Sequence, residues 1–153
     1  LALLQRASRT PLLLRQIPLT ENGIEPAVIE LNIETARELR AQGRSSVYGD
    51  ASQRETLESA GVRNAGSLFL TADVQNSAEV IRQARELNPR ISVLARTSHL
   101  RDAEALRQAG AQTVFSGEGE VALALTESVL RRLGATPDQI DRERERVHTE
   151  LIR

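Results

Sequence analysis

The 153-residue chain has no cysteine, no methionine, no tryptophan and no lysine, so all 20 of its basic residues are arginine. The lack of cysteine excludes disulfide frameworks, thiol catalysis and cysteine-ligated zinc, and two histidines argue against a histidine-rich metal site. The lack of lysine excludes Schiff-base enzymes and the P-loop lysine of nucleotide hydrolases. We therefore expect no metal site, and these absences exclude several classes of enzyme.

Aromatic residues, excess positive charge and long apolar runs are scarce as well. Aromatic residues make up 2% of the chain and the net charge is −1, which argues against a nucleic-acid partner. No apolar run approaches the about 20 residues that cross a bilayer, and Gln5 and Arg6 interrupt the start too early for a signal peptide. We therefore expect a soluble chain, and because it has no methionine and begins at Leu1, we interpret it as a piece of a longer protein or as a processed product.

What the chain does contain is a regular alternation of short apolar runs and helical patterns. Strand patterns cover 27–31, 45–48, 66–72, 91–96 and 112–115, and helical patterns cover 33–43, 52–61, 73–88 and 97–110. This alternation is typical of βαβ units with parallel strands and right-handed crossovers. It predicts an α/β fold, a Rossmann-like doubly wound parallel sheet with C-terminal helices. A first strand near 1–4 and a helix over 11–23 would complete it, although Pro18 would break that helix.

After Phe115 the alternation ends, and two helices follow. We divide the chain into a Rossmann-like domain over 1–134, with an atypical segment at 1–26, and a charged C-terminal helix over 135–153. The segment 116–120 is interpreted as a flexible corner before the apolar helix 118–134. Thr136 and Pro137 are typical of the start of the last helix, whose narrow apolar stripe suits packing on its own domain or on a neighbouring subunit.

Two helix starts carry capping signals. Asn32 is predicted as the N-cap of the helix 33–43, which ends at Gly43. In the stretch VYGDAS, residues 47–52, Ser52 with Glu55 matches a capping box for the next helix. The Gly-Asp pair of the same stretch also stands at the carboxyl end of a strand, where α/β proteins bind nucleotides.

Polar side chains at the strand ends form the candidate binding site. Glu30 and Asp50 end neighbouring strands, and an acid at such a position accepts ribose hydroxyls in dinucleotide-binding folds. Arg96 ends the fourth secure strand and suits a phosphate or carboxylate, or else a salt bridge to Asp73 or Asp50. The predicted cofactor-binding residues are Glu30, Asn32, Asp50, Ala51, Thr71, Ala72, Asp73 and Arg96. Asp73 matches a helix N-cap equally well.

Motifs for catalysis and for a pyrophosphate cradle are absent. There is no G-x-S-x-G nucleophile elbow, and His99 and His148 fall in helical patterns away from the strand ends, so we expect no catalytic residue. There is also no G-x-G-x-x-G, and Gly23 is the only glycine before Glu30. The sequence therefore offers a candidate nucleotide site without its usual glycine-rich loop.

Several stretches together resemble a known family. VIELN, VYGDAS, LESAGV, LFLTADVQNSAEVIRQARELNPRISVLART and LRQAGAQTVFSGEGEVALALTESVL are similar to the regulator of K⁺ conductance (RCK, TrkA-N-like) domain. This domain occurs in bacterial potassium channels, potassium-uptake subunits and monovalent cation:proton antiporters, and the likeness is greatest to the potassium-efflux antiporters. It covers roughly residues 27–134.

The resemblance implies a regulatory domain, not an enzyme, that binds NAD(H) or an adenine nucleotide such as AMP or ATP. It implies a homodimer at the cytoplasmic face of the inner membrane that acts on a membrane transport domain for potassium or sodium. By position, Glu30 would bind the ribose, Asp50 and Ala51 would border the adenine, 71–73 would line the floor, and Arg96 would face the phosphates. The helix 118–134 would pack across the partner. Two other functions remain open, a fragment of an NAD-dependent oxidoreductase and a ligand-free dimerisation module.

Overall fold

A single parallel sheet organises the protein, whose computed structural model describes residues 2–6, 26–71 and 76–152. Its strands are β1 (Ala2–Arg6), β2 (Pro26–Glu30), β3 (Ser46–Tyr48), β4 (Ser67–Leu70), β5 (Ser92–Thr97) and β6 (Thr113–Ser116). They lie in the order β3-β2-β1-β4-β5-β6, and each neighbouring pair is parallel. This is the strand order of the doubly wound dinucleotide-binding fold, so the predicted fold and its first strand are confirmed. The predicted helix over 11–23 lies outside the described residues.

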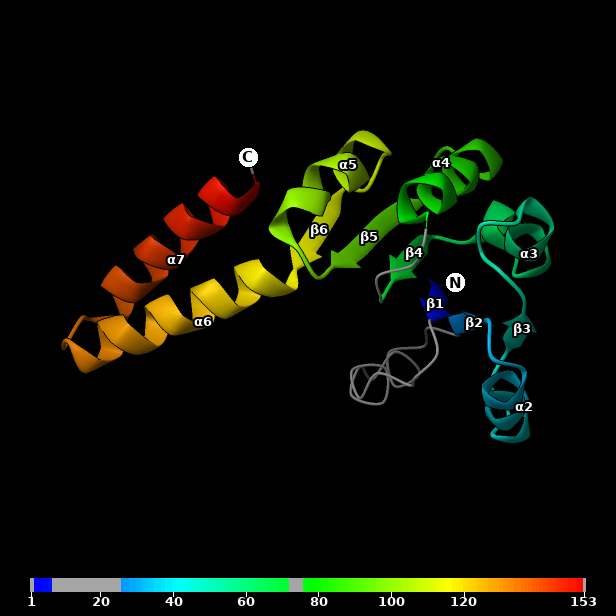
Figure 1. The fold of residues 1–153 in the computed structure, drawn as a ribbon, viewed down its shortest axis with the longest axis horizontal. Coiled ribbons are helices and arrows are strands. Elements are labelled where there is room, and N and C mark those ends of the chain that lie inside the picture. The colour runs from blue at the N-terminus through cyan, green and yellow to red at the C-terminus, as the bar shows by residue number, and fades with distance from the viewer. Residues whose placement is uncertain (1, 7–25, 72–75, 153) are drawn as a thin grey trace.

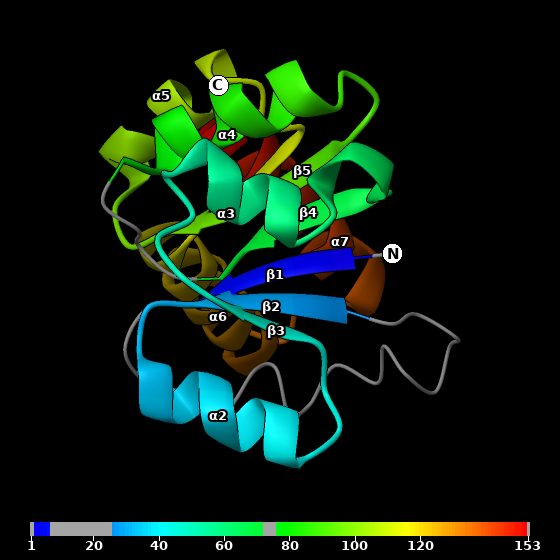
Figure 2. The ribbon, with the colours of Figure 1, turned by 90° about the vertical axis from the view of Figure 1, so that its right-hand side faces the viewer.

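Helices cover both faces of this sheet. They are α2 (Ile33–Ala41), α3 (Arg54–Ser59), α4 (Ser77–Leu87), α5 (Ala103–Gln108), α6 (Gly117–Arg132) and α7 (Pro137–Ile152), with short 3-10 turns η2 (Val62–Asn64) and η3 (Leu100–Asp102). Figure 2 shows α3, α4 and α5 on one side of the sheet and α2 on the other. Figure 1 shows α6 and α7 extending beyond β6, away from the rest of the molecule.

Strand residues alternate between two cores because successive side chains point to opposite faces. Ile29 of β2 and Leu68 of β4 have no exposed surface and join the large core with Ile81 of α4. On the other face, Val28 of β2 packs with Leu39 of α2. Both faces of β2 are thus covered, which explains its continuous apolar sequence.

The helix starts confirm one capping prediction and correct another. Asn32 caps α2, because its Oδ1 accepts from the backbone N–H groups of Glu34 and Thr35 at 2.9 and 3.1 Å. The predicted capping box of Ser52 is wrong, since the N-cap of α3 is Gln53, which makes no side-chain cap bond. The N–H of Ser52 instead donates to Asp50 Oδ1 at 2.8 Å, a local turn that moves the helix start one residue along.

The N-cap of α4 is Asn76, in the left-handed conformation with φ 66°, and Asp73, which the sequence offered as an N-cap, lies outside the described residues. Gly43 has φ 74° after the end of α2. This is the conformation that glycine adopts at low cost, as predicted for the residue that terminates the helix.

The two C-terminal helices form a hairpin. The interpretation of 116–120 as a flexible corner is wrong, because Ser116 caps α6 by accepting from the N–H of Gly119 at 2.9 Å. Thr136 and Gln139 exchange hydrogen bonds at the start of α7, as predicted for its cap. α7 packs along α6, with Ile140 buried. Among the described helices, none is both long and apolar enough to span a bilayer.

Candidate functional site

The candidate site lies at the edge of the sheet where the parallel strands end. The N–H of Gly49 donates to the backbone oxygen of Glu30 at 3.0 Å, which joins the end of β2 to the residue after β3. Asp50 follows directly. The structure therefore brings Glu30 and Asp50 to one edge, as the sequence predicted, and β4 and β5 end at the same edge.

Glu30 is the most unusual residue of this edge, because it is a carboxylate that is only 1% exposed. Its Oε1 accepts from the N–H of Asn32 at 2.9 Å. Its Oε2 is buried and has no hydrogen-bond partner among the described residues. A buried acceptor left unpaired costs about 1–3 kcal/mol, and more when it is charged. Such an atom is expected where a ligand hydroxyl completes the hydrogen bonding, so Glu30 fits the ribose of a nucleotide.

Asp50, Gly49 and Ala51 form the neighbouring turn. Asp50 is half-buried, and its Oδ1 accepts from the N–H of Ser52. Ala51 has no exposed surface and belongs to the large core, so its contact with an adenine stays a prediction. A Cβ at Gly49 would lie 2.8 Å from Thr56 Oγ1 of α3. The glycine of VYGDAS is therefore required by packing within the chain, whatever ligand binds there.

The remaining predicted residues are placed less completely. Asn32 lies at the edge, but its Oδ1 is already used to cap α2. Thr71 follows β4 and is half-buried, while Ala72 and Asp73 lie outside the described residues. The roles of these four residues in ligand binding stay predictions.

Arg96 contributes a positive group to this edge. It is exposed, and it makes no hydrogen bond or ion pair with any residue in the described ranges, so the alternative of a salt bridge to Asp50 is not found. Val93 and Ala95 of β5 join the large core, so Arg96 lies on the opposite face of the sheet. By the same alternation Glu30 lies on that face too. Arg96 Nη2 is 3.8 Å from the position of a Cβ on Gly117, and thus lies beside the start of α6.

The sequence did not indicate a role for Glu118, which is hydrogen-bonded to His99 across the start of α6. The distance between Glu118 Oε1 and His99 Nδ1 is 2.9 Å. This hydrogen bond, followed by that from the N–H of Leu100, holds the pKa of Glu118 below its ordinary value of 4.5. No periodic signal connects a residue in the first turn of α6 with one that lies 19 positions earlier, in the segment after β5.

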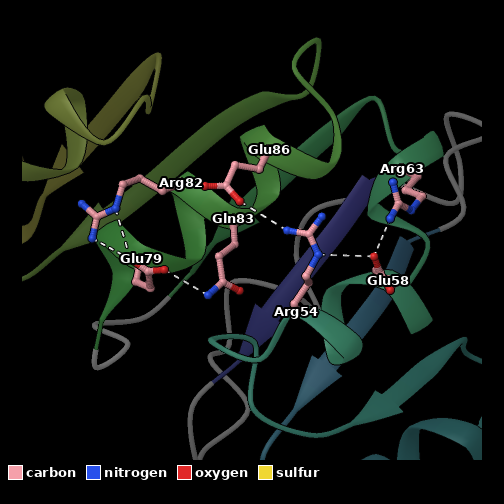
Figure 3. A network of polar contacts seen from close by, with 7 residues as sticks. All are labelled: Arg54, Glu58, Arg63, Glu79, Arg82, Gln83 and Glu86. Carbon is pink, nitrogen blue, oxygen red and sulfur yellow. Dashed lines mark hydrogen bonds and ion pairs between the residues drawn. The ribbon is translucent and has the colours of Figure 1, made fainter.

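A second group of charged residues joins α3 to α4 on the surface (Figure 3). Arg54 lies 3.3 Å from Glu86 and 3.6 Å from Glu58, and Arg82 binds Glu79 at 2.7 Å. The hydrogen bond from Arg82 is the main reason that the pKa of Glu79 is lowered. Exposed pairs of this kind contribute little to stability because water and salt screen them, so we interpret the group as surface ion pairs that link α3 to α4.

Comparison with known proteins agrees with this geometry. The family model of the TrkA-N domain matches residues 15–117. The crystal structure of the TrkA-N domain of inner membrane protein YbaL from Escherichia coli is 30% identical, with a TM-score of 0.75. The match covers 82% of this chain and 93% of that one.

Two more distant structures share the fold. The Kef CTD of Shewanella denitrificans in its AMP-bound form is 17% identical, with a TM-score of 0.69, over 99% of this chain and 94% of its own. The GsuK channel bound to NAD is 23% identical, with a TM-score of 0.68, over 82% of this chain. The match covers 23% of the GsuK chain, so this chain corresponds to a small part of that protein.

Proposed function

This chain belongs to the TrkA-N domain family, and we propose that it is a nucleotide-sensing regulatory domain of a membrane transporter for potassium or sodium. It acts without catalysing a reaction, at the cytoplasmic face of the inner membrane, on a transport domain of the same chain or of a partner chain. The relatives support this assignment, because they include an inner membrane protein and a channel, and two were crystallised with NAD or AMP.

The observation that carries the proposal is the unpartnered Oε2 of Glu30. This oxygen is buried at the carboxyl end of β2, the position at which doubly wound folds bind the ribose of an adenine nucleotide. A ribose hydroxyl donates the hydrogen bond that Oε2 lacks. Asp50, at the next strand end, supplies an acceptor for the adenine amino group, and Arg96 supplies charge for phosphate. NAD(H), AMP and ATP share these features.

The direct test is thermal unfolding of the chain with and without NAD⁺, NADH, AMP and ATP. A ligand at about 100 times its dissociation constant adds about 2.7 kcal/mol of stability, which raises the midpoint by several degrees. Glu30→Gln is expected to reduce this shift by about half or more. Glu38→Gln is the matched control, because Glu38 is an exposed glutamate of α2 in the same βα unit. A folded wild-type protein whose midpoint none of the four nucleotides moves would refute nucleotide sensing.

The same proposal includes a homodimer that packs through α6. Val121, Leu125 and Val129 are 59, 62 and 54% exposed and recur every four residues, and Leu133 continues this apolar stripe beyond the helix end. Residues four apart lie on one helix face, and exposed apolar stripes are typical of association sites. Leu125→Asp is expected to give a monomer in light scattering, whereas Ala124→Asp, at an exposed position off the stripe, keeps the dimer. A Leu125→Asp dimer as tight as wild type would refute this interface.

One observation favours a second function. The sequence from Leu1 to Asn22 contains no glycine, so the residues that follow β1 in the chain do not include the glycines that usually approach a pyrophosphate closely. A domain that has lost nucleotide binding would act as a ligand-free dimerisation module. It would form the α6 dimer and show no shift with any nucleotide, which is how the two functions are distinguished.

A further inference from the structure

Glu118 makes three contacts with the segment that follows β5. Its backbone N–H donates to the oxygen of Ser98 at 3.2 Å. Its Oε2 accepts from the N–H of Leu100 at 2.9 Å, and its Oε1 lies 2.9 Å from His99 Nδ1. Both carboxylate oxygens are thus used, and the segment 98–100 is held to the first turn of α6.

This segment begins at the candidate site. It continues directly from Arg96 and Thr97 at the carboxyl end of β5. Gly117, the first residue of α6, lies against the same residues, since a Cβ there would be 3.4 Å from the oxygen of Ser98 and 3.8 Å from Arg96 Nη2. A change in the position of Arg96 or of the segment 98–100 therefore reaches Glu118 through adjoining atoms.

The first turn also determines where the rest of α6 lies. Gly119 is the only buried residue of α6, and Figure 1 shows the helix leaving the sheet with α7 alongside it. A helix of 16 residues is about 24 Å long at 1.5 Å per residue. A rotation of about 10° at its start would displace its far end, which carries Val129 and Leu133 of the apolar stripe, by about 4 Å.

We propose that Glu118 is a positioning residue that couples the segment 98–100, at the ligand edge of the sheet, to the direction in which α6 leaves the domain. The coupling to a ligand depends on the proposed function, because a nucleotide is what would move this segment. The role of Glu118 in positioning α6 does not depend on the proposed function.

The absence of cysteine allows a direct measurement of the helix direction. Spin labels at Ala105→Cys on α5 and Ser128→Cys on α6, both exposed positions, report the distance between helix and domain. Labelled protein is mixed with an excess of unlabelled protein so that only distances within one chain are read. We expect a narrow distribution in wild type and a broadened, displaced one in Glu118→Ala. Glu118→Gln, which keeps one acceptor oxygen, is expected to fall between them.

Glu120→Ala is the matched control, because Glu120 is an exposed glutamate of the same helical turn. It removes the same charge near the helix start and is expected to keep the wild-type distribution. Identical distributions in wild type, Glu118→Ala and Glu118→Gln, with circular dichroism unchanged, would overturn the positioning role.

The coupling is tested by adding NADH or AMP while calorimetry measures binding. We expect NADH, which is long enough to reach Arg96, to shift the distance in wild type and to bind Glu118→Ala without shifting it. Binding of NADH to wild type with no change of distance would overturn the coupling. Failure of wild type to bind would refute the proposed nucleotide function, while the comparison without nucleotide still decides whether Glu118 positions α6.

Discussion

Replacing Glu30 by glutamine should have opposite effects on the stability of the free protein and on nucleotide binding. Glutamine keeps an oxygen for the N–H of Asn32, which now binds Oε1 at 2.9 Å. It removes the negative charge from a side chain that is 1% exposed and whose Oε2 has no hydrogen-bond partner among the described residues. The amide group that replaces Oε2 is also unpartnered but carries no charge, and a buried charge costs more than a buried neutral group, so we expect Glu30→Gln to raise the free energy of unfolding by about 1–2 kcal/mol.

The same substitution should weaken nucleotide binding. A hydrogen bond to a charged group is worth about 1.5–3 kcal/mol, and each 1.4 kcal/mol is a factor of ten in affinity. We therefore expect the dissociation constant to rise about 10- to 100-fold. At a ligand concentration that is about 100 times the wild-type constant, the stabilisation by ligand falls from about 2.7 kcal/mol to about 0.4–1.4 kcal/mol.

Differential scanning calorimetry in the presence and absence of ligand measures both effects. One kcal/mol corresponds to about 2–4 °C for a domain of this size. We expect the free variant to melt several degrees above wild type and to gain less from ligand. A variant that melts below wild type without ligand and shows the full ligand shift would refute the reasoning, because Glu30 would then be a structural acid.

Three further predictions concern the same edge. Gly49→Ala places a Cβ 2.8 Å from Thr56 Oγ1, so urea unfolding should show that the free energy of unfolding falls by about 1–3 kcal/mol. Adding Thr56→Ala should restore it, and an unchanged free energy in Gly49→Ala would contradict the packing requirement. Arg96→Gln should weaken the binding of NADH more than the binding of AMP, as measured by calorimetry. Equal losses of affinity for both nucleotides would show that Arg96 does not distinguish them. The pKa of Glu118 is lowered, so its carboxylate stabilises the fold above about pH 4.5 and this contribution is lost as the pH falls through the lowered pKa. The stability difference between wild type and Glu118→Gln should therefore shrink as the pH falls below about 4.5, and a constant difference would contradict the hydrogen bonds from His99 and Leu100 that lower this pKa.

The sheet could be predicted from the sequence because its signals are local. Each strand is a short apolar run between turn residues, and right-handed crossovers then fix parallel neighbours. The positions of Glu30, Asp50 and Arg96 follow, because a residue at the end of a parallel strand has one edge to lie on. The local sequence did not indicate that Oε2 of Glu30 would be buried without a hydrogen-bond partner. Its burial depends on how neighbouring elements pack around the side chain.

Both wrong predictions concern which side chain accepts from a backbone N–H group near a helix start. Ser52 matches a capping box, but Asp50 accepts from the N–H of Ser52 and α3 starts after Gln53. The glycines of 116–120 suggested a corner, but Ser116 accepts from the N–H of Gly119 and starts a helix. Which acceptor binds depends on the tertiary placement of the segment, which the spacing of residue types does not contain.

The distance between Glu30 and Arg96 limits which ligands can contact both residues. Glu30 ends β2 and Arg96 is near the end of β5, on the same face, with β1 and β4 between them. Three strand spacings of about 4.8 Å place their strands about 14 Å apart. A ligand held by its ribose at Glu30 must therefore extend across β1 and β4 before it meets Arg96. A dinucleotide has a second phosphate and a second ribose to span that width, whereas a mononucleotide has one phosphate near its only ribose. Because Arg96 also lies beside Gly117, only the longer ligand would act directly on the start of α6.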